Sequence, residues 1–352
     1  CNSMLNFSLS KEVGERRGCG AMKAKIPLVA VGSMVVWLVA APAPGVEVSE
    51  QLKVAGFAIA QYAEVDKAGG EDDRSWAEVH PLYLSFDFHP TPPWRALVET
   101  EYEHLPALAG DSGSDTPDSG SGEILLQRAY IEYSHNDLIN IQAGKFFTPA
   151  GLFMATHWRL LTPSYERPIY FENKTFYIPA HQVGLHYFGQ HEFDNSGWGT
   201  RCDAWWTLGA ANEGTDNSET DFNNPGANVR MNYRDWLSFG MAYQGLKATA
   251  DFDRNQDSVL AFAQLRLFQE RLVLSSEYVT TRLDPAFGNT NALENVAAVY
   301  VGAEYKFASK WSIYYRYDVG DDIKRSGASA PTDETNSKAV INTLAVSWEP
   351  NA

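Results

Sequence analysis

The chain is poor in cysteine, in basic residues and in long apolar runs. Its 352 residues include three cysteines, and its formal net charge is −16. So acidic a surface repels the phosphates of nucleic acid, and no nucleic-acid partner is expected. Beyond residue 45 no apolar run approaches the roughly 20 residues that a membrane-spanning helix needs. A chain with so few cysteines must owe its stability to a well-packed core or to a lipid environment, because disulfides cannot supply it.

The first 45 residues differ from the rest. From Met22 the chain shows two lysines, an apolar run from Ile26 to Ala41, and then small residues. This three-part pattern is typical of a secretory signal peptide, with cleavage between Ala41 and Gly45. A short membrane anchor or a buried helix is the alternative, but the run is shorter than a membrane span.

The chain therefore divides into three parts. Residues 1–21 start without Met and show no periodicity, and we interpret them as an upstream or non-native extension. Residues 22–45 are the predicted signal peptide, and 46–352 the mature domain. Cleavage would remove Cys1 and Cys19 and leave Cys202, so the mature chain has no intramolecular disulfide.

The mature part repeatedly alternates apolar and polar residues with a period of two, which indicates β-strands. In WSIYYRYD, residues 311–318, Trp311, Ile313, Tyr315 and Tyr317 share one face. LSFGMAYQ, residues 237–244, sorts in the same way. A soluble β-sandwich would also alternate, so this pattern alone does not decide the fold.

The connections discriminate better. We predict fourteen strands, near residues 50–62, 77–88, 94–105, 122–135, 138–147, 182–190, 198–210, 226–233, 236–247, 258–268, 271–282, 295–307, 310–319 and 338–349. The connections alternate strictly between short and long ones. A sandwich has no reason to keep its long loops at one end, whereas outer-membrane barrels combine tight periplasmic turns with long external loops.

The predicted fold is therefore an all-β, transmembrane, antiparallel up-and-down β-barrel of about 14 strands. Closure leaves no edge unpaired in lipid. Apolar faces would meet lipid and charged faces would line a lumen, which reconciles a mean hydropathy of −0.31 with a membrane protein. Tryptophans near strand ends suit the interfacial girdles, and ordinary core positions are the alternative, which does not explain why so many of them lie next to turns. They are Trp76, Trp94, Trp198, Trp236, Trp311 and Trp348.

Residues 125–152, LLQRAYIEYSHNDLINIQAGKFFTPAGL, contain a strand–turn–strand pattern followed by G-K-F-x-T-P-x-G. This stretch resembles the Gram-negative porins, in particular the phosphate-selective porin O and P group. The resemblance implies a bacterial outer-membrane channel for small hydrophilic solutes and ions, with anions such as phosphate among them. Members of that group commonly have sixteen strands, so 16 is the alternative count. Outer-membrane barrels usually end on an aromatic residue, whereas this chain ends LAVSWEPNA.

One long connection, residues 145–181, is rich in aromatic residues and proline where the others are rich in Gly, Ser and Asp. It follows the fifth predicted strand, and porins fold their third loop inward from this position. We predict an inward-folded constriction loop with a short helix from Gly151 to Leu161 and a small hairpin over 169–178. A loop folded outward over the mouth is the alternative. The loop's candidate pore charges are Lys145, His157, Arg159, Arg167 and Lys174.

Alternation also assigns charges to the predicted lumen. Facing walls of opposite charge would orient dipolar solutes and set ion preference, unless the charges pair with one another. A bulge would shift any strand's facing by one residue. The candidate lumen-facing charges are Glu99, Glu101, Glu103, Arg128, Glu132, Arg201, Arg230, Arg266 and Arg316.

Two other classes of function remain open from the sequence. An outer-membrane hydrolase would need a catalytic arrangement, but no nucleophile motif or metal spacing joins His157, His181, His186 and Asp203. No catalytic residue, metal or cofactor is therefore predicted. A structural or adhesive barrel without an open channel is harder to exclude. The expected partners are outer-membrane lipid, the barrel assembly machinery and small polar solutes or ions, with a homotrimer as one possible assembly.

Overall fold

The computed structural model describes the backbone of twelve stretches of the chain. They are residues 5–12, 34–39, 43–65, 74–103, 108–110, 123–154, 168–171, 177–210, 223–247, 254–285, 295–322 and 337–348. Within them the fold is all-β, apart from a short 3-10 helix, η3 (Ile169–Phe171). None of the helices in these stretches is long and apolar enough to cross a membrane.

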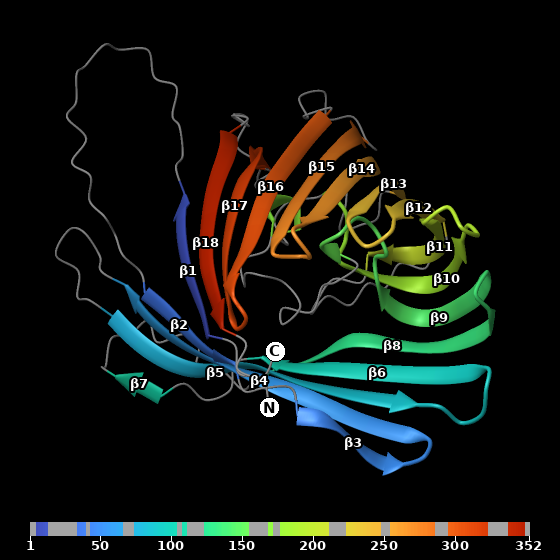
Figure 1. Cartoon of the computed structure of the whole chain (residues 1–352), viewed down its shortest axis with the longest axis horizontal. Coiled ribbons are helices and arrows are strands. Elements are labelled where there is room, and N and C mark those ends of the chain that lie inside the picture. The colour runs from blue at the N-terminus through green and yellow to red at the C-terminus, as the bar shows by residue number, and fades with distance from the viewer. Residues whose placement is uncertain are drawn as a thin grey trace.

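Fourteen strands follow one another in an antiparallel up-and-down order and match the fourteen predicted from the sequence. They are β4 (Leu52–Val65), β5 (Arg74–Phe88), β6 (Trp94–Glu103), β8 (Glu123–Asn136), β9 (Ile139–Phe147), β10 (His181–Glu192), β11 (Trp198–Ala210), β12 (Asn224–Tyr233), β13 (Leu237–Leu246), β14 (Arg254–Leu267), β15 (Leu272–Pro285), β16 (Asn295–Ala308), β17 (Trp311–Asp322) and β18 (Ser337–Trp348). Each pairs with the next along this series in one sheet. The sheet curves around an interior (Figure 1). The predicted fold class is confirmed.

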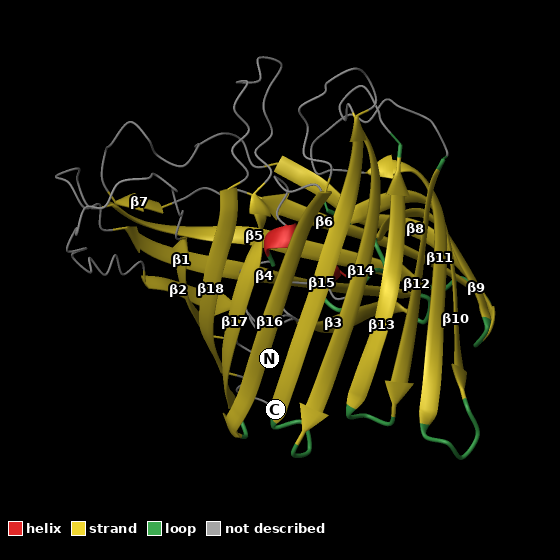
Figure 2. Cartoon of the chain, turned by 90° about the horizontal axis from the view of Figure 1, so that it is seen from above, coloured by secondary structure: helices red, strands yellow, loops and turns green. Residues whose placement is uncertain are grey.

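Short turns gather at one edge of the sheet. The connections from β10 to β11, from β12 to β13 and from β14 to β15 lie together there (Figure 2). Aromatic side chains cluster at the same edge: the ring centroids of Trp198 and Tyr233 are 4.7 Å apart, and those of Tyr233 and Trp236 are 5.6 Å apart. Trp94, Trp236 and Trp311 are exposed beside short turns. This arrangement fits an interfacial girdle better than a buried core.

Four further strands flank the series: β1 (Leu5–Glu12), β2 (Met34–Val39), β3 (Ala43–Ser49) and β7 (Leu108–Gly110). β7 pairs with β5, and β3 forms a hairpin with β4. β18 pairs with β1, β1 with β2, and β2 with β4. Through β1 and β2 the pairings lead from β18 back to β4, which makes a series of sixteen strands, and no pairing between described residues joins β18 directly to β4.

β1 and β2 lie within the predicted extension and signal peptide. Cleavage after Ala41 would remove both strands, together with their pairing to residues 341–346 of β18 and 59–64 of β4. Lipid offers no partner for the backbone groups so released.

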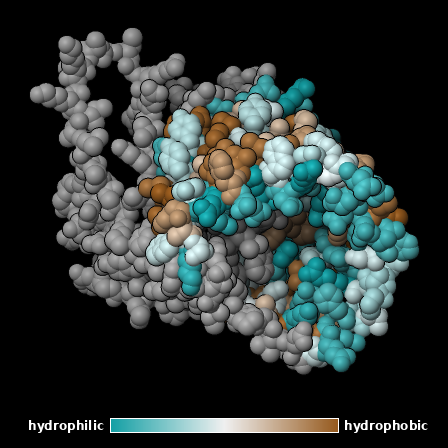
Figure 3. Space-filling model, in the orientation of Figure 1, coloured by the Kyte–Doolittle hydropathy of each residue, from teal (hydrophilic) through white to brown (hydrophobic). Residues whose placement is uncertain are grey.

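The polarity of the sheet is inverted relative to a water-soluble protein. On β17, Arg316 and Asp318 are 1% and 0% exposed, whereas Tyr315 and Tyr317, on the other face, are 46% and 43% exposed. Met241 on β13 is 59% exposed and faces away from the interior. In the view of Figure 3, hydrophobic side chains gather over β15–β17 and hydrophilic ones over β9–β11. An outward apolar face of this extent is costly in water and favourable in lipid.

We expect the purified protein to be heat-modifiable. Hydrogen-bonded strand ladders buried in detergent resist sodium dodecyl sulfate until heated, so the unboiled protein should migrate faster on a gel than the boiled protein. Circular dichroism should show β-structure in the unboiled sample. Equal mobility of the two samples, with a helical spectrum, would contradict the fold.

Candidate functional site

The long connection between β9 and β10 is closed at its neck. The backbone N–H of Thr148 donates to the carbonyl of Ala180 at 2.9 Å, and the Thr148 hydroxyl donates to the carbonyl of Pro179. The two ends of the loop therefore leave the sheet side by side. From this neck, the described parts of the loop turn into the interior.

The first contact with the inner wall is made by Leu152. Its backbone N–H donates to Glu277 on β15, a carboxylate that is 1% exposed. The hydroxyl of Tyr170, on η3, donates to the other oxygen of the same carboxylate. Burial and the neighbouring Glu277 carboxylate raise the pKa of the Tyr170 hydroxyl well above its usual value, so it remains a donor at physiological pH.

Two further contacts hold later parts of the loop. The N–H of Ile169 donates to Asp318 on β17 at 3.4 Å, and Asp318 is paired with Arg316 at 2.6 Å. The backbone carbonyl of Tyr177 accepts a hydrogen bond from the side-chain amide of Gln256 at 2.6 Å. The Tyr177 hydroxyl donates to backbone carbonyls of β16 and β17. Glu277, Asp318 and Gln256 all lie on the inner face of the sheet.

These contacts bury an apolar cluster inside the sheet. Met154, Tyr170 and Tyr177 from the loop are at most 1% exposed and join Leu260 and Val279 from the wall. The described parts of the loop are thus folded inward, and an outward loop is excluded for them. Aromatic residues suit this position because they pack against the wall as Gly, Ser and Asp cannot. The expected hairpin over 169–178 is corrected in its first arm, because Ile169–Phe171 forms a 3-10 turn.

The inner face of β5–β8 carries paired charges. Arg95 on β6 donates to Asp87 on β5 at 2.8 Å, and Arg128 on β8 holds the Glu99 carboxylate through two guanidinium nitrogens. The Glu132 carboxylate lies 3.8 Å from Arg95. These wall charges therefore pair with one another, which is the alternative that the sequence analysis left open.

A β-bulge decides which residues of β8 face the interior. Glu99 pairs with Arg128 but Thr100 pairs with Leu126, so Gln127 has no residue opposite it on β6. Because the extra residue breaks the alternation, Gln127 and Arg128 both turn to the interior, towards Glu101 and Glu99 respectively. Strict alternation from the sequence would have placed only one of them there.

A second polar cluster lies on β9–β12. His186 contacts Asp203 at 3.1 Å through Nε2 and Gln142 at 3.0 Å through Nδ1. Arg201 and Asn228 also donate to the Asp203 carboxylate. A His–Asp pair is part of many hydrolase sites, but here the second ring nitrogen is held by an amide. In the part of the chain that the structure describes, this histidine is hydrogen-bonded to Asp203 and Gln142 and packs against the rings of Phe146 and Phe188.

Positive charge gathers on the neighbouring strands. Arg201 and Arg230 lie directly opposite one another on β11 and β12. The Arg230 guanidinium lies 5.2 Å from the centre of the Phe262 ring and donates to the carbonyl of Gly151 at 2.6 Å. It therefore forms another link between wall and loop. Arg266, on β14, is exposed near the short turn after that strand.

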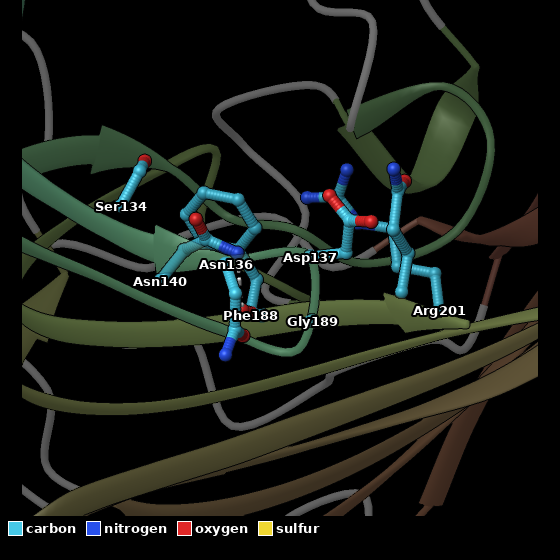
Figure 4. Close-up of a pocket in the computed structure, with 8 residues that line it drawn as sticks. Ser134, Asn136, Asp137, Asn140, Phe188, Gly189 and Arg201 are labelled. Carbon is cyan, nitrogen blue, oxygen red and sulfur yellow. Dashed lines mark hydrogen bonds between the residues drawn. The ribbon is translucent and has the colours of Figure 1, made fainter. Parts of the chain in front are cut away.

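A cavity of about 300 Å³ opens near the short-turn edge (Figure 4). Ser134, Asn136 and Asn140 come from the β8–β9 hairpin, and Phe188 and Arg201 come from β10 and β11. The Arg201 guanidinium lies 5.1 Å from the centre of the Phe188 ring. Most of the lining residues carry polar side chains, and Phe188 adds an apolar ring to them.

The predicted charges fall into three groups. The charges on the inner face are Glu99, Glu101, Glu132, Arg201, Arg230, Arg266 and Arg316, together with Arg128 through the bulge. His157, Arg159, Arg167, Lys174 and the side chain of Glu103 lie outside the described residues. Lys145 is predicted as a loop charge, but it lies on β9, inside the strand predicted over 138–147. Lys145 therefore sits on the face opposite the buried Phe146, and its ammonium donates to the carbonyl of Leu126.

Glu277 and Tyr177 hold the loop to the inner wall, and neither is among the predicted site residues. Alternation places Glu277 on the inner face, but nothing in the sequence signals that the loop approaches it from 125 residues away. Among the described residues, no group of three His, Cys, Asp or Glu side chains is placed so that it could hold a metal ion.

No family model and no curated protein matches the chain. Solved structures do match it. OpdK of Pseudomonas aeruginosa, solved with vanillate, has a TM-score of 0.51 and 9% identity, covering 99% of this chain and 97% of that one. OccAB4 of Acinetobacter baumannii has a TM-score of 0.50 and 10% identity, with 99% and 97% coverage. An anion-selective porin from Comamonas acidovorans has a TM-score of 0.47 and 12% identity, with 85% and 99% coverage.

At these identities the likeness concerns the fold alone. The chain has the all-β, up-and-down fold of Gram-negative outer-membrane porins. The comparisons do not single out the phosphate-selective group that residues 125–152 resemble.

The buried Arg316–Asp318 pair gives a test of the interior. Asp318→Asn would leave the Arg316 guanidinium buried without its counter-charge, and we expect a loss of about 3–5 kcal/mol in unfolding free energy. Asp284→Asn breaks the exposed Arg282–Asp284 pair on β15 and should cost less than about 1 kcal/mol. Urea unfolding in lipid vesicles measures both. Equal losses for the two variants would show that the β17 pair is not shielded from water.

Proposed function

We propose that the protein forms a water-filled channel in the bacterial outer membrane, through which small hydrophilic solutes and ions diffuse passively. The observation that carries this proposal is the inverted polarity of a sheet with a porin fold. Ionised side chains such as Glu99, Arg128 and Asp203 line its inner face, and apolar ones such as Met241 and Tyr315 cover its outer face. A polar inner face is what a solute path through lipid requires.

The loop between β9 and β10 narrows this channel. Its described parts pack against β14–β17 and are linked to β12 by Arg230, so they occupy space inside the sheet. The opposite wall, β5–β11, carries the charge pairs and the polar cavity. We infer that solutes pass along this second wall.

We propose that the loop's cations decide ion preference and favour anions, phosphate included. Along the wall, Glu99 is neutralised by Arg128 and Asp203 by Arg201, so each pair contributes little field beyond the Debye length of about 8 Å at physiological salt. Residues 152–178 hold Arg159, Arg167 and Lys174 against Glu166 and Glu172, so this loop carries a net charge of +1. In a narrow, poorly screened passage, a few such charges outweigh many distant ones.

The location follows from the same proposal. The predicted signal peptide would direct export, the assembly machinery would insert the sheet into the outer membrane, and lipid would cover the outer face. A homotrimer is one assembly compatible with a porin fold. A structural or adhesive barrel would share the fold but conduct no ions, and electrical recording separates the two.

Planar bilayer recording tests the function directly. The wild-type protein should give stepwise conductance, and deletion of residues 152–178 should give a folded protein of larger single-channel conductance, because the flanking strands keep their own ladders while the deleted loop occupied the lumen. Heat-modifiability of both proteins is the control for folding. Absence of any wild-type conductance would favour a structural or adhesive barrel, and unchanged conductance after the deletion would place the loop outside the path.

Selectivity provides a separate prediction. Replacing Arg159, Arg167 and Lys174 by Gln should move the reversal potential under a salt gradient towards cation preference and weaken block by phosphate. Replacing Glu99, Glu101 and Glu103 by Gln should move it the other way, because Arg128 then loses its counter-charge. If replacing the three cations leaves the reversal potential unchanged, the loop serves only for packing and selectivity is set elsewhere.

A further inference from the structure

Glu277 is enclosed by hydrogen-bond donors from two parts of the loop and from the wall. The backbone N–H groups of Leu152 and Phe153 donate to its carboxylate, as does the hydroxyl of Tyr170. On the wall, the hydroxyl of Tyr300, on the neighbouring strand β16, is a further donor. One carboxylate thus joins the start of the loop, its later 3-10 turn and two strands of the sheet.

The chain at Gly151 is shaped for this contact. Gly151 has a φ of +69°, which favours glycine, and a Cβ atom built on it would lie 2.1 Å from a Glu277 carboxylate oxygen. Following this residue, the N–H groups of Leu152 and Phe153 point together at the carboxylate. Such a concave set of backbone N–H groups after a left-handed residue is an anion-binding nest. Here the anion is supplied by the protein itself.

The surroundings keep this contact dry and fixed. The rings of Tyr170 and Tyr300 stack with centroids 6.3 Å apart and planes 10° apart. Arg230 donates to the carbonyl of Gly151, so the same turn is held from a second strand. Since Glu277 is 1% exposed, it is shielded from passing solutes, and a role as a selectivity charge does not fit it.

We propose that Glu277 is a positioning residue whose carboxylate, seated in the nest of residues 151–153, fixes the loop inside the channel and so sets the width of the passage. This inference rests on the proposed function and assigns a task to the T-P-A-G stretch of residues 148–151. Thr148 closes the neck of the loop, and Gly151 admits the carboxylate. Opening of the loop then requires the release of all the donors that share one carboxylate.

The test compares Glu277→Gln with Glu304→Gln. Glu304 lies on the inner face of β16 and has no contact with the described parts of the loop, so the second variant matches the change in charge. Tyr170→Phe, which removes a single hydroxyl, and Gly151→Ala provide milder and steric alternatives. Heat-modifiability shows which variants have folded.

The first measurement is trypsin cleavage of intact protein in lipid vesicles, followed by mass spectrometry of fragments cut at Arg159 and Lys174. Losing charge-assisted hydrogen bonds of this kind should raise the cleavage rate of Glu277→Gln by roughly tenfold or more. Glu304→Gln should be cut at the wild-type rate. Tyr170→Phe should fall between the two, and if Glu277→Gln does not fold, Tyr170→Phe and Gly151→Ala decide the matter.

The second measurement is single-channel recording of the same proteins. We expect Glu277→Gln to show a larger and noisier conductance than wild type, with a smaller change in reversal potential than the loop-cation variants. Cleavage and conductance that match those of Glu304→Gln would overturn the proposal. A wild-type protein that does not conduct would contradict the proposed function. The role of Glu277 could still be tested by the cleavage rates, because cleavage does not require an open channel.

Discussion

Every backbone group of a strand that crosses lipid must find its partner in a neighbouring strand, and the rest of this structure depends on that constraint. It requires consecutive antiparallel strands, which β4–β18 supply. It also determines the face on which each side chain lies, because successive residues of a pleated strand point to opposite faces of the sheet. Once lipid covers one face, that face must be apolar, and the polar residues of the same strands have only the interior left to them.

The interior then faces the opposite problem, because charges gathered there need partners. Three solutions coexist on the inner face. Arg128 and Glu99 form an ion pair across neighbouring strands. His186 and Asp203 contact each other, and each is also hydrogen-bonded to a side-chain amide. Glu277 accepts hydrogen bonds from the backbone of the loop. The third solution links the wall to the loop, so satisfying a buried carboxylate and narrowing the interior are achieved by the same contacts. A loop made of Gly, Ser and Asp would lack the aromatic rings that shield this contact from water.

Much of the fold could be predicted from local patterns, because period-two alternation and loop length are local properties. The faces of β17, with Tyr315 and Tyr317 outside and Arg316 and Asp318 inside, follow directly from that alternation. Where the pattern breaks, prediction fails: the bulge at Gln127 has no distinct sequence signal. Long-range contacts are harder still, since the contact of Gly151 with Glu277 joins residues far apart in the chain. The sequence explains a glycine at 151 only after the carboxylate is seen.

The orientation of the strand faces is the central claim, and oxygen accessibility of spin labels measures it most directly. Spin labels are placed singly at successive positions from 237 to 244 on β13, in a chain whose Cys1, Cys19 and Cys202 are replaced by Ser. Because oxygen dissolves better in lipid than in water, the accessibility at each position reports whether its side chain faces lipid. The account predicts high accessibility at 239, 241 and 243 in lipid vesicles and low accessibility at the positions between them. Maxima at 238, 240 and 242, or no period of two, would contradict it.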